Sequence, residues 1–252
     1  MEGLSNKTIV VTGGAGGIGL ATVKRLAAAG SKVIIADMPS SNGRSLAAQV
    51  GEGRGMVEFM PIDVTSVESL TQAADEVVSR HGNVDGVVAN AGIAILSGAF
   101  DYDEVSWRKT MAVNLDGAFF TAQSFARHMR GRGGSVVLIS SIAGRSVVQP
   151  EKCAAYGATK AAVEHLAALL GVEWARDGIR VNAVGPGRTE TPMIERIAKE
   201  SPEMVASWMS QVPIGRLIRP EEVANAVAFF LSDLSSGCTG TTLMVDGGYD
   251  KT

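Results

Sequence analysis

The chain has 252 residues, a formal net charge of −3 and 46% hydrophobic residues. This balance is typical of a globular protein with a large core, and a slightly acidic chain lacks the basic surface of proteins that bind nucleic acid or anionic membranes. Cys153 and Cys238 lack metal-ligand spacing and favour a reducing compartment. The polar first seven residues are too short for a signal sequence, and no apolar run reaches membrane-spanning length. We therefore expect a cytoplasmic protein without a metal site.

Apolar runs and helical patterns alternate along the whole chain. Predicted strands lie at 7–12, 32–37, 56–61, 84–90, 134–140, 179–185 and 241–247, and predicted helices at 17–29, 42–50, 66–80, 110–130, 155–176 and 221–232. The strands are almost continuously apolar, as expected when both faces of a sheet are buried. The alternation predicts one α/β domain over residues 1–252, a Rossmann-type doubly wound parallel sheet of about seven strands with helices on both faces.

The stretch VVTGGAGGIG at 10–19 joins the first predicted strand to the first predicted helix. Backbone N–H groups at a helix N-terminus attract a pyrophosphate, and glycines let it approach closely. Thr12 followed by Gly13, Gly17 and Gly19 fits the pattern T-G-x-x-x-G-x-G, and a G-x-G-x-x-G register is also present. A tight turn alone would explain the glycines, but the flanking strand and helix favour a dinucleotide site.

An acidic residue, Asp37, ends the second predicted strand and is followed by Met38. A carboxylate at this place accepts hydrogen bonds from the adenosine ribose and repels a 2′-phosphate. Neither Met38 nor Gly16 offers the positive charge that NADP would need. The sequence therefore predicts NAD as the cofactor, although Asp37 would also serve as the cap of a turn before Pro39.

Tyr156 and Lys160, in YGATK, are four residues apart and therefore lie on one face of a helix. A nearby ammonium group favours the phenolate form of tyrosine, and a phenolate whose pKa is tuned toward neutrality can take the proton of an alcohol while a hydride leaves its carbon. The same two residues would also suit an ordinary exposed helix face.

These motifs together resemble the classical short-chain dehydrogenase/reductase family, in the family's order from residue 12 to residue 248. TGGAGGIG resembles the family's cofactor loop, DV at 63–64 its adenine contact, NAG at 90–92 its fourth-strand motif and VDGG its C-terminal signature. VNLDG, ISSIAG and YGATK match its catalytic segments, and PGRTET resembles the segment that holds the nicotinamide carboxamide.

The resemblance implies two sets of site residues. The catalytic set is Asn114, Ser141, Tyr156 and Lys160. The cofactor-binding set is Gly13, Gly17, Ile18, Gly19, Asp37, Asp63, Val64, Asn90, Ala91, Gly92, Tyr156, Lys160, Pro186, Gly187, Thr189 and Thr191. Tyr156 would be the acid or base, Lys160 would tune it and hold the nicotinamide ribose, and Ser141 would position the substrate oxygen.

Two of these assignments have alternatives. Ser141 with Gly144 fits the family's S-x-x-G pattern, whereas the adjacent Ser140 would satisfy backbone groups at a strand end. Asn114 would keep its helix locally kinked and hold a water in a proton relay from Lys160, but an ordinary core asparagine is the other interpretation.

The substrate side of the site is less defined by the sequence. The loop between Ser141 and Tyr156 is about two residues longer than is usual in the family, and it brings Arg145, Gln149, Glu151 and Lys152 to the mouth of the site, as solvated residues or as a substrate contact. The family varies its substrate pocket in the segment matching 188–213. That segment offers Met193, Ile197, Met204, Val205, Trp208 and Met209, an apolar set that suits either an uncharged substrate or plain packing.

We therefore expect an oxidoreductase that transfers a hydride between NAD and a secondary alcohol or ketone, such as a polyol, cyclic alcohol or steroid. A 3-oxoacyl thioester reductase is the alternative, although that branch usually uses NADPH. A dinucleotide-sensing protein with an inactive site is a third, which the complete catalytic set disfavours.

The broad apolar faces of helices 110–130, 155–176 and 221–232 exceed what docking on a sheet requires, so we expect a homotetramer with the C-terminal VDGGYDKT near a subunit boundary.

Overall fold

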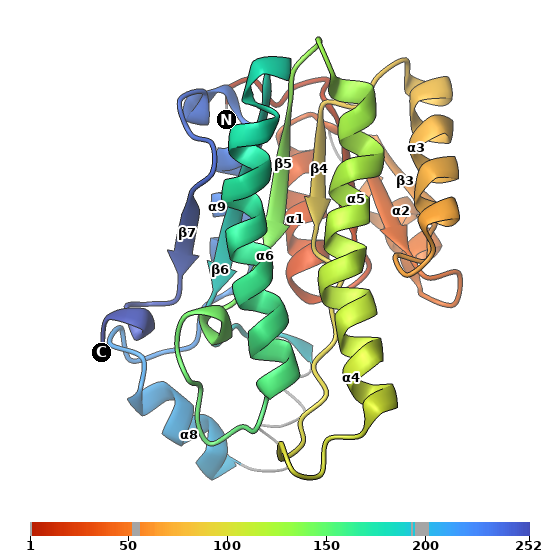
Figure 1. Cartoon of the computed structure of the whole chain (residues 1–252). Coiled ribbons are helices and arrows are strands. Elements are labelled where there is room, and N and C mark those ends of the chain that lie inside the picture. The colour runs from red at the N-terminus through yellow and green to blue at the C-terminus, as the bar shows by residue number, and fades with distance from the viewer. Residues whose placement is uncertain (1, 52–55, 193, 195–201) are drawn as a thin grey trace.

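A seven-stranded parallel sheet forms the centre of the molecule (Figure 1). The computed structural model describes residues 2–51, 56–192, 194 and 202–252. The strands are β1 (Thr8–Thr12), β2 (Lys32–Asp37), β3 (Val57–Pro61), β4 (Gly86–Ala89), β5 (Gly134–Ile139), β6 (Ile179–Pro186) and β7 (Thr242–Val245). Their order is β3-β2-β1-β4-β5-β6-β7, so the chain reverses direction across the sheet between β1 and β4. Dinucleotides bind at such a reversal, outside the carboxyl ends of the strands.

Helices cover both faces of the sheet, as the alternating pattern predicted. The helices are α1 (Gly17–Ala28), α2 (Gly43–Gly51), α3 (Val67–His81), α4 (Glu104–Met111), α5 (Gly117–Ala126), α6 (Ala154–Glu173), α8 (Pro202–Ser210) and α9 (Pro220–Leu231). In Figure 1, α3, α5 and α6 lie in front of the sheet, and α1, α2 and α9 lie behind it. The predicted fold class is therefore confirmed.

Each face of the sheet carries its own apolar core. Leu70, Val87 and Phe125 are among the buried residues beneath α3, α5 and α6, and Leu26, Ile35 and Phe230 are among those beneath α1 and α9. Successive strand residues point to opposite faces, so a strand such as β1, buried at all five positions, contributes to both cores. This explains why the strands read as continuous apolar runs.

The helix expected over residues 110–130 begins earlier and is interrupted. It starts at Glu104, where the Asp103 side chain accepts a hydrogen bond from the Ser106 N–H group and caps the first turn. A π-helical turn at Ala112–Asp116 separates α4 from α5 and holds Asn114 in its middle. The distortion expected around Asn114 is thus present, whereas the predicted start at residue 110 was wrong, because α4 is largely exposed and shows no apolar periodicity.

In the described residues, no helix combines the length and the apolar character needed to cross a membrane.

Candidate active site

The four predicted catalytic residues converge near the carboxyl ends of β4 and β5. Asn114 is buried, and its side-chain amide donates to the Ile93 carbonyl oxygen at 2.9 Å and to the Thr159 hydroxyl at 3.3 Å, while its oxygen accepts from the Ile93 N–H group at 2.8 Å. These bonds tie the π-helical turn to the segment after β4 and to α6. A Cβ on Gly92 would lie 3.4 Å from Asn114 Oδ1 and 3.6 Å from Lys160 Nζ, so this glycine lies beside both side chains.

The two adjacent serines after β5 have different roles. The Ser140 hydroxyl donates to the Lys160 carbonyl oxygen at 2.9 Å and is fully inside the protein, so this serine joins β5 to α6. Ser141 accepts a 3.2 Å bond from the Ala143 N–H group, and its hydroxyl is also within reach of the Tyr156 phenol. The geometry therefore favours Ser141 as the serine of the site and gives Ser140 the structural role.

Tyr156 and Lys160 lie one turn apart on α6, with Lys160 Nζ 5.6 Å from the centroid of the tyrosine ring. Lys160 is 4% exposed and donates a 2.7 Å hydrogen bond to the Ile139 carbonyl oxygen at the end of β5. Burial lowers the pKa of Lys160 to about 8. Burial also raises the pKa of Tyr156, and the hydrogen bond from Ser141 acts in the opposite direction. The chain alone therefore keeps the phenol protonated, contrary to the direction expected from Lys160.

A cleft of about 850 Å³ lies at the carboxyl ends of the strands, where the strand order reverses between β1 and β4. Nine of the predicted cofactor residues line it: Gly13, Ile18, Asp37, Asp63, Val64, Asn90, Ala91, Gly92 and Thr191. The remaining predicted residues, Gly17, Gly19, Tyr156, Lys160, Pro186, Gly187 and Thr189, are not part of its lining. The cleft joins glycines, the acidic end of β2 and the segment after β4 in one continuous surface.

The glycine loop packs so closely against its surroundings that a side chain does not fit at two of its positions. Gly13 has a φ of +62°, and a Cβ there would lie 2.9 Å from the Cα of Ala91. A Cβ on Gly19 would lie 2.1 Å from the Gly13 carbonyl oxygen, so only glycine fits. Gly16 caps α1 without a side-chain hydrogen bond, which leaves the first N–H groups of the helix available to an anion.

Asn90 supports this loop from below. Its side-chain amide donates to the carbonyl oxygens of Thr12 at 2.9 Å and Gly13 at 3.0 Å, and the Thr12 hydroxyl accepts from the Asn90 N–H group at 3.1 Å. In the structure Asn90 therefore holds the glycine loop against β4, in addition to lining the cleft.

Both predicted acidic residues face the cleft. One oxygen of Asp37 accepts from the Ala15 N–H group in the glycine loop at 2.9 Å, and the other accepts from the Met38 N–H group at 2.8 Å. Asp63 accepts from the backbone and hydroxyl of Thr65 at 2.9 and 2.7 Å. A dinucleotide suits this cleft, because the glycine loop opens toward the first turn of α1 and a carboxylate stands at the end of β2.

The segment after β6 closes over the same region. The Gly187 N–H group donates to the Val245 carbonyl oxygen at 2.9 Å, and a Cβ on Gly187 would lie 2.6 Å from the Cα of Asp246. Thr189 donates to the Gly187 carbonyl oxygen at 2.9 Å and pairs with Ile218. A Cβ on Gly17 would lie 3.4 Å from the Thr191 side chain. Residues about 170 positions apart thus meet at the glycine loop.

Known proteins resemble the chain over nearly its whole length. The family model described as "Enoyl-(Acyl carrier protein) reductase" matches residues 13–250. Galactitol 2-dehydrogenase (L-tagatose-forming) of Cereibacter sphaeroides is 38% identical over 247 residues, 98% of this chain and 96% of that protein. Cis-4-hydroxycyclohexanecarboxylate dehydrogenase of Sinomonas cyclohexanicum is 37% identical over 250 residues, 98% of both chains. A crystal structure of a short-chain type dehydrogenase/reductase from Mycobacterium marinum superposes with a TM-score of 0.93 at 32% identity, covering 98% of this chain and 96% of that one.

The chain belongs to the short-chain dehydrogenase/reductase family. The comparisons confirm the predicted reaction class, oxidoreduction of a secondary alcohol or ketone, and the predicted dependence on a nicotinamide dinucleotide.

Sequence reasoning missed several contacts of this short-chain dehydrogenase/reductase. Thr159, which accepts from Asn114, and the Ile139 carbonyl, which accepts from Lys160, carry no motif signal because their roles depend on the fold.

On the substrate side, Trp208 is buried, Met209 is exposed, and Met193 and Ile197 lie outside the described residues. Arg145 binds Glu164, and Arg188 binds Glu151. The apolar wall expected from 188–213 therefore also contains a charged pair.

Proposed function

We propose that the protein is an NAD-dependent dehydrogenase that interconverts a secondary alcohol and its ketone, with a polyol or cyclic alcohol as substrate. The observation that carries the proposal is the convergence of Ser141, Tyr156 and Lys160 at the carboxyl end of β5, beside a dinucleotide-sized cleft. When bound, the nicotinamide supplies the hydride chemistry, and the chain supplies orientation and proton transfer.

Tyr156 moves the proton at the substrate oxygen. Because burial raises the pKa of its phenol, the form present at neutral pH is the acid, which donates its proton to a ketone oxygen during reduction. In the oxidation direction the phenol must first lose its proton. The Ser141 hydrogen bond favours that loss, and so does the positive charge that Lys160 keeps below a pH of about 8.

NAD is the cofactor that the cleft favours. The Asp37 carboxylate stands where the adenosine ribose would bind, and the neighbouring Met38 and Gly16 are uncharged. Lys109 is the one lysine or arginine along the cleft lining in the described part of the chain, and it lines the α4 side together with Ala112 and Val113. A 2′-phosphate near Asp37 would therefore meet a negative charge.

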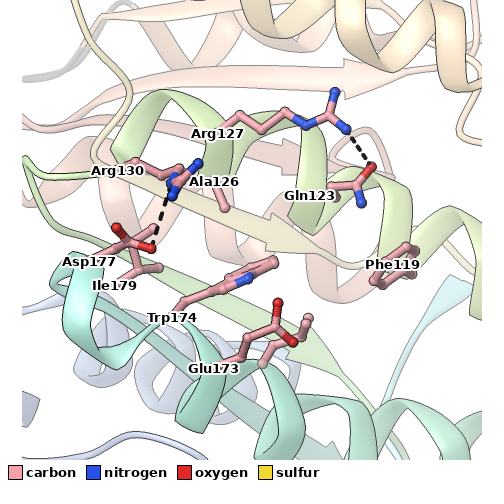
Figure 2. A pocket seen from close by; sticks show the side chains of 10 residues that line it. Phe119, Gln123, Ala126, Arg127, Arg130, Glu173, Trp174, Asp177 and Ile179 are labelled. Carbon is pink, nitrogen blue, oxygen red and sulfur yellow. Dashed lines mark hydrogen bonds and ion pairs between the residues drawn. The ribbon is translucent and has the colours of Figure 1, made fainter.

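We propose a homotetramer as the assembly. On α6, Leu169 and Val172 are 54% and 77% exposed, and Leu243 is exposed on the edge strand β7. A groove of about 480 Å³ lies between α5 and α6, where Phe119 and Trp174 stand among charged residues including the ion pair Arg130–Asp177 (Figure 2). Ile179 in this groove begins β6, so the groove lies toward the amino ends of the strands, away from Tyr156, and suits a subunit contact.

The free cysteines, Cys153 and Cys238, agree with a reducing location, and we propose the cytoplasm.

A substrate panel tests the proposed reaction. Galactitol, cyclohexanol, a hydroxysteroid and a 3-hydroxyacyl thioester are each incubated with NAD and with NADP, and the absorbance of the reduced cofactor is followed. We expect turnover of at least one secondary alcohol with NAD, and its loss in Tyr156→Phe. Binding of NAD without turnover of any alcohol or ketone would instead indicate a dinucleotide-sensing protein, and turnover confined to the thioester would indicate an acyl reductase.

A further inference from the structure

A buried charged pair joins the long loop before α6 to the segment after β6. Two guanidinium nitrogens of Arg188 bind the two carboxylate oxygens of Glu151, one of them at 2.9 Å, and the arginine also donates to the Gln149 carbonyl oxygen at 3.0 Å. The side chains of Arg188 and Glu151 are 10% and 11% exposed. A two-pronged, largely dry contact of this kind fixes both side chains in one geometry.

The pair joins the loop that leads into α6 to the segment predicted to hold the nicotinamide. Glu151 lies two residues before Cys153, the N-cap of α6, and Tyr156 follows in the first turn of that helix. Arg188 stands between Gly187 and Thr189, which belong to the predicted cofactor set. The pair therefore lies at the N-terminal end of the helix that carries Tyr156.

Trp208 completes the cluster from α8. The Arg188 guanidinium lies 4.6 Å from the centroid of the Trp208 ring, and the tryptophan is 2% exposed. Two buried donors of this cluster, Arg188 Nε and Trp208 Nε1, have no acceptor among the residues that the structure describes. A buried donor without a partner is costly, so these two N–H groups indicate a place where a ligand oxygen is accommodated.

We propose that Arg188, Glu151 and Trp208 form the selectivity element of the substrate pocket, which accepts uncharged hydroxyl groups and excludes carboxylates. This inference rests on the proposed function, because it concerns the remote end of the substrate of that reaction. Glu151 already occupies the guanidinium fork of Arg188 and cancels its charge, so a substrate carboxylate would have to displace it. A hydroxyl oxygen needs only the two free N–H donors.

Two relatives of the chain differ in the charge of the substrate for which they are named. One relative is named for a neutral polyol, galactitol, and the other for a carboxylate, cis-4-hydroxycyclohexanecarboxylate. With Glu151 neutralising the arginine, the pocket suits the polyol. Without the Glu151 charge, the buried guanidinium would suit the carboxylate, because an arginine binds a carboxylate through two parallel hydrogen bonds.

The test compares kcat/KM for galactitol, cyclohexanol and cis-4-hydroxycyclohexanecarboxylate in the wild type and in Glu151→Gln. We expect the wild type to prefer the two neutral alcohols. In Glu151→Gln, the kcat/KM for the carboxylate divided by that for cyclohexanol should rise tenfold or more. Calorimetry with cyclohexanecarboxylate, which has no reacting hydroxyl, should detect binding to the NAD complex of Glu151→Gln and none to that of the wild type. Glu203→Gln, on the exposed face of α8, makes the same charge change and should match the wild type.

A second variant keeps the test decisive if Glu151→Gln does not fold. The double variant Arg188→Met with Glu151→Met removes the guanidinium and the carboxylate together. Proteins often tolerate the replacement of a buried ion pair by apolar side chains of similar size. We expect its KM for galactitol to rise about tenfold, while its kcat/KM for cyclohexanol stays within about threefold. The inference would be overturned if the ratios of kcat/KM among the three substrates were unchanged in both variants, or if the wild type preferred the carboxylate. A wild type inactive on every alcohol would instead contradict the proposed function.

Discussion

The ammonium group of Lys160 lies 5.6 Å from the centroid of the Tyr156 ring while it donates a 2.7 Å hydrogen bond to the Ile139 carbonyl oxygen. The bond to β5 fixes the position of the ammonium group one helical turn from the tyrosine. The same burial that fixes Lys160 lowers its pKa and raises that of Tyr156. In the chain alone, burial is therefore the main influence on the pKa of both groups.

The first prediction concerns the phenol of Tyr156. Tyr156→Phe should reduce kcat at least about a hundredfold, because the substrate oxygen loses its acid or base. The affinity for NAD should be retained, since the cleft is lined by other residues. Steady-state kinetics and NAD titration check both parts. Lys152→Met, on the exposed loop before α6, serves as the control and should alter neither, and a phenylalanine variant with near-wild-type kcat would remove Tyr156 from the mechanism.

The second prediction concerns the pH profile of alcohol oxidation. Oxidation needs the Tyr156 phenolate, and the hydrogen bond from Ser141 lowers the pKa of that phenol. Ser141→Ala should therefore move the rising limb of kcat/KM against pH to higher pH, and should also reduce kcat about a hundredfold because the substrate oxygen loses a positioning donor. Ser140→Ala, which removes a bond to the Lys160 backbone, should leave the position of the limb unchanged. A limb that stays in place in Ser141→Ala would contradict the assignment.

The third prediction concerns stability and Lys160. Its pKa is about 8 in the folded protein and about 10.4 in an unfolded chain, so the unfolded state binds more protons between these values. The free energy of unfolding should therefore rise with pH from about 8 to about 10.4. Below pH 8 Lys160 is charged in both the folded and the unfolded state, and its burial lowers the free energy of unfolding by about 3 kcal/mol.

Lys160→Met checks this sign directly. At pH 7 the variant should unfold in urea at a higher midpoint than the wild type, although its turnover and its affinity for NAD should fall. The difference in midpoint should shrink as the pH approaches 10.4. If the variant is less stable than the wild type by the same amount at pH 7 and at pH 10, burial of the Lys160 charge does not lower the free energy of unfolding.

The sequence was most informative where local chemistry decides the structure. Apolar runs such as KVIIAD predict strands because both faces of the sheet are buried, and the glycines at 13 and 19 mark positions where a Cβ would collide with backbone. The predicted catalytic set rests on family motifs, and the structure brings its four residues together near the carboxyl ends of β4 and β5. These features need only neighbouring residues or a known pattern to be read.

The sequence was least informative where contacts join distant segments. The pairing of Glu151 with Arg188 spans 37 positions and depends on how the long loop folds over the end of β6. The pKa of Tyr156 was expected to fall because Lys160 is near, yet burial, which no spacing reveals, acts more strongly in the opposite direction. The start of α4 at Glu104 was missed because its exposed face has no apolar period.

The fourth prediction concerns cofactor choice. Wild-type kcat/KM should favour NAD over NADP, and each tenfold of preference corresponds to about 1.4 kcal/mol. Asp37→Ala with Met38→Arg should relax or reverse the preference, because it removes the charge that repels a 2′-phosphate and adds one that attracts it. Asp37→Asn keeps the size of the side chain and should give an intermediate ratio. Equal use of both cofactors by the wild type would refute the role of Asp37.

The fifth prediction concerns assembly. Leu169 and Val172 project from α6 with most of their surface exposed, and apolar surface of this kind on a folded subunit marks an interface. A symmetric homotetramer would bury it through closed two-fold contacts. Light scattering at micromolar concentration should give about four times the mass of one 26.2 kDa chain, and Leu169→Glu with Val172→Glu should lower that mass. Ser79→Glu, at an exposed polar position on α3, is the control and should leave the assembly intact. A wild-type mass of one chain with full activity would show that these faces need no neighbour.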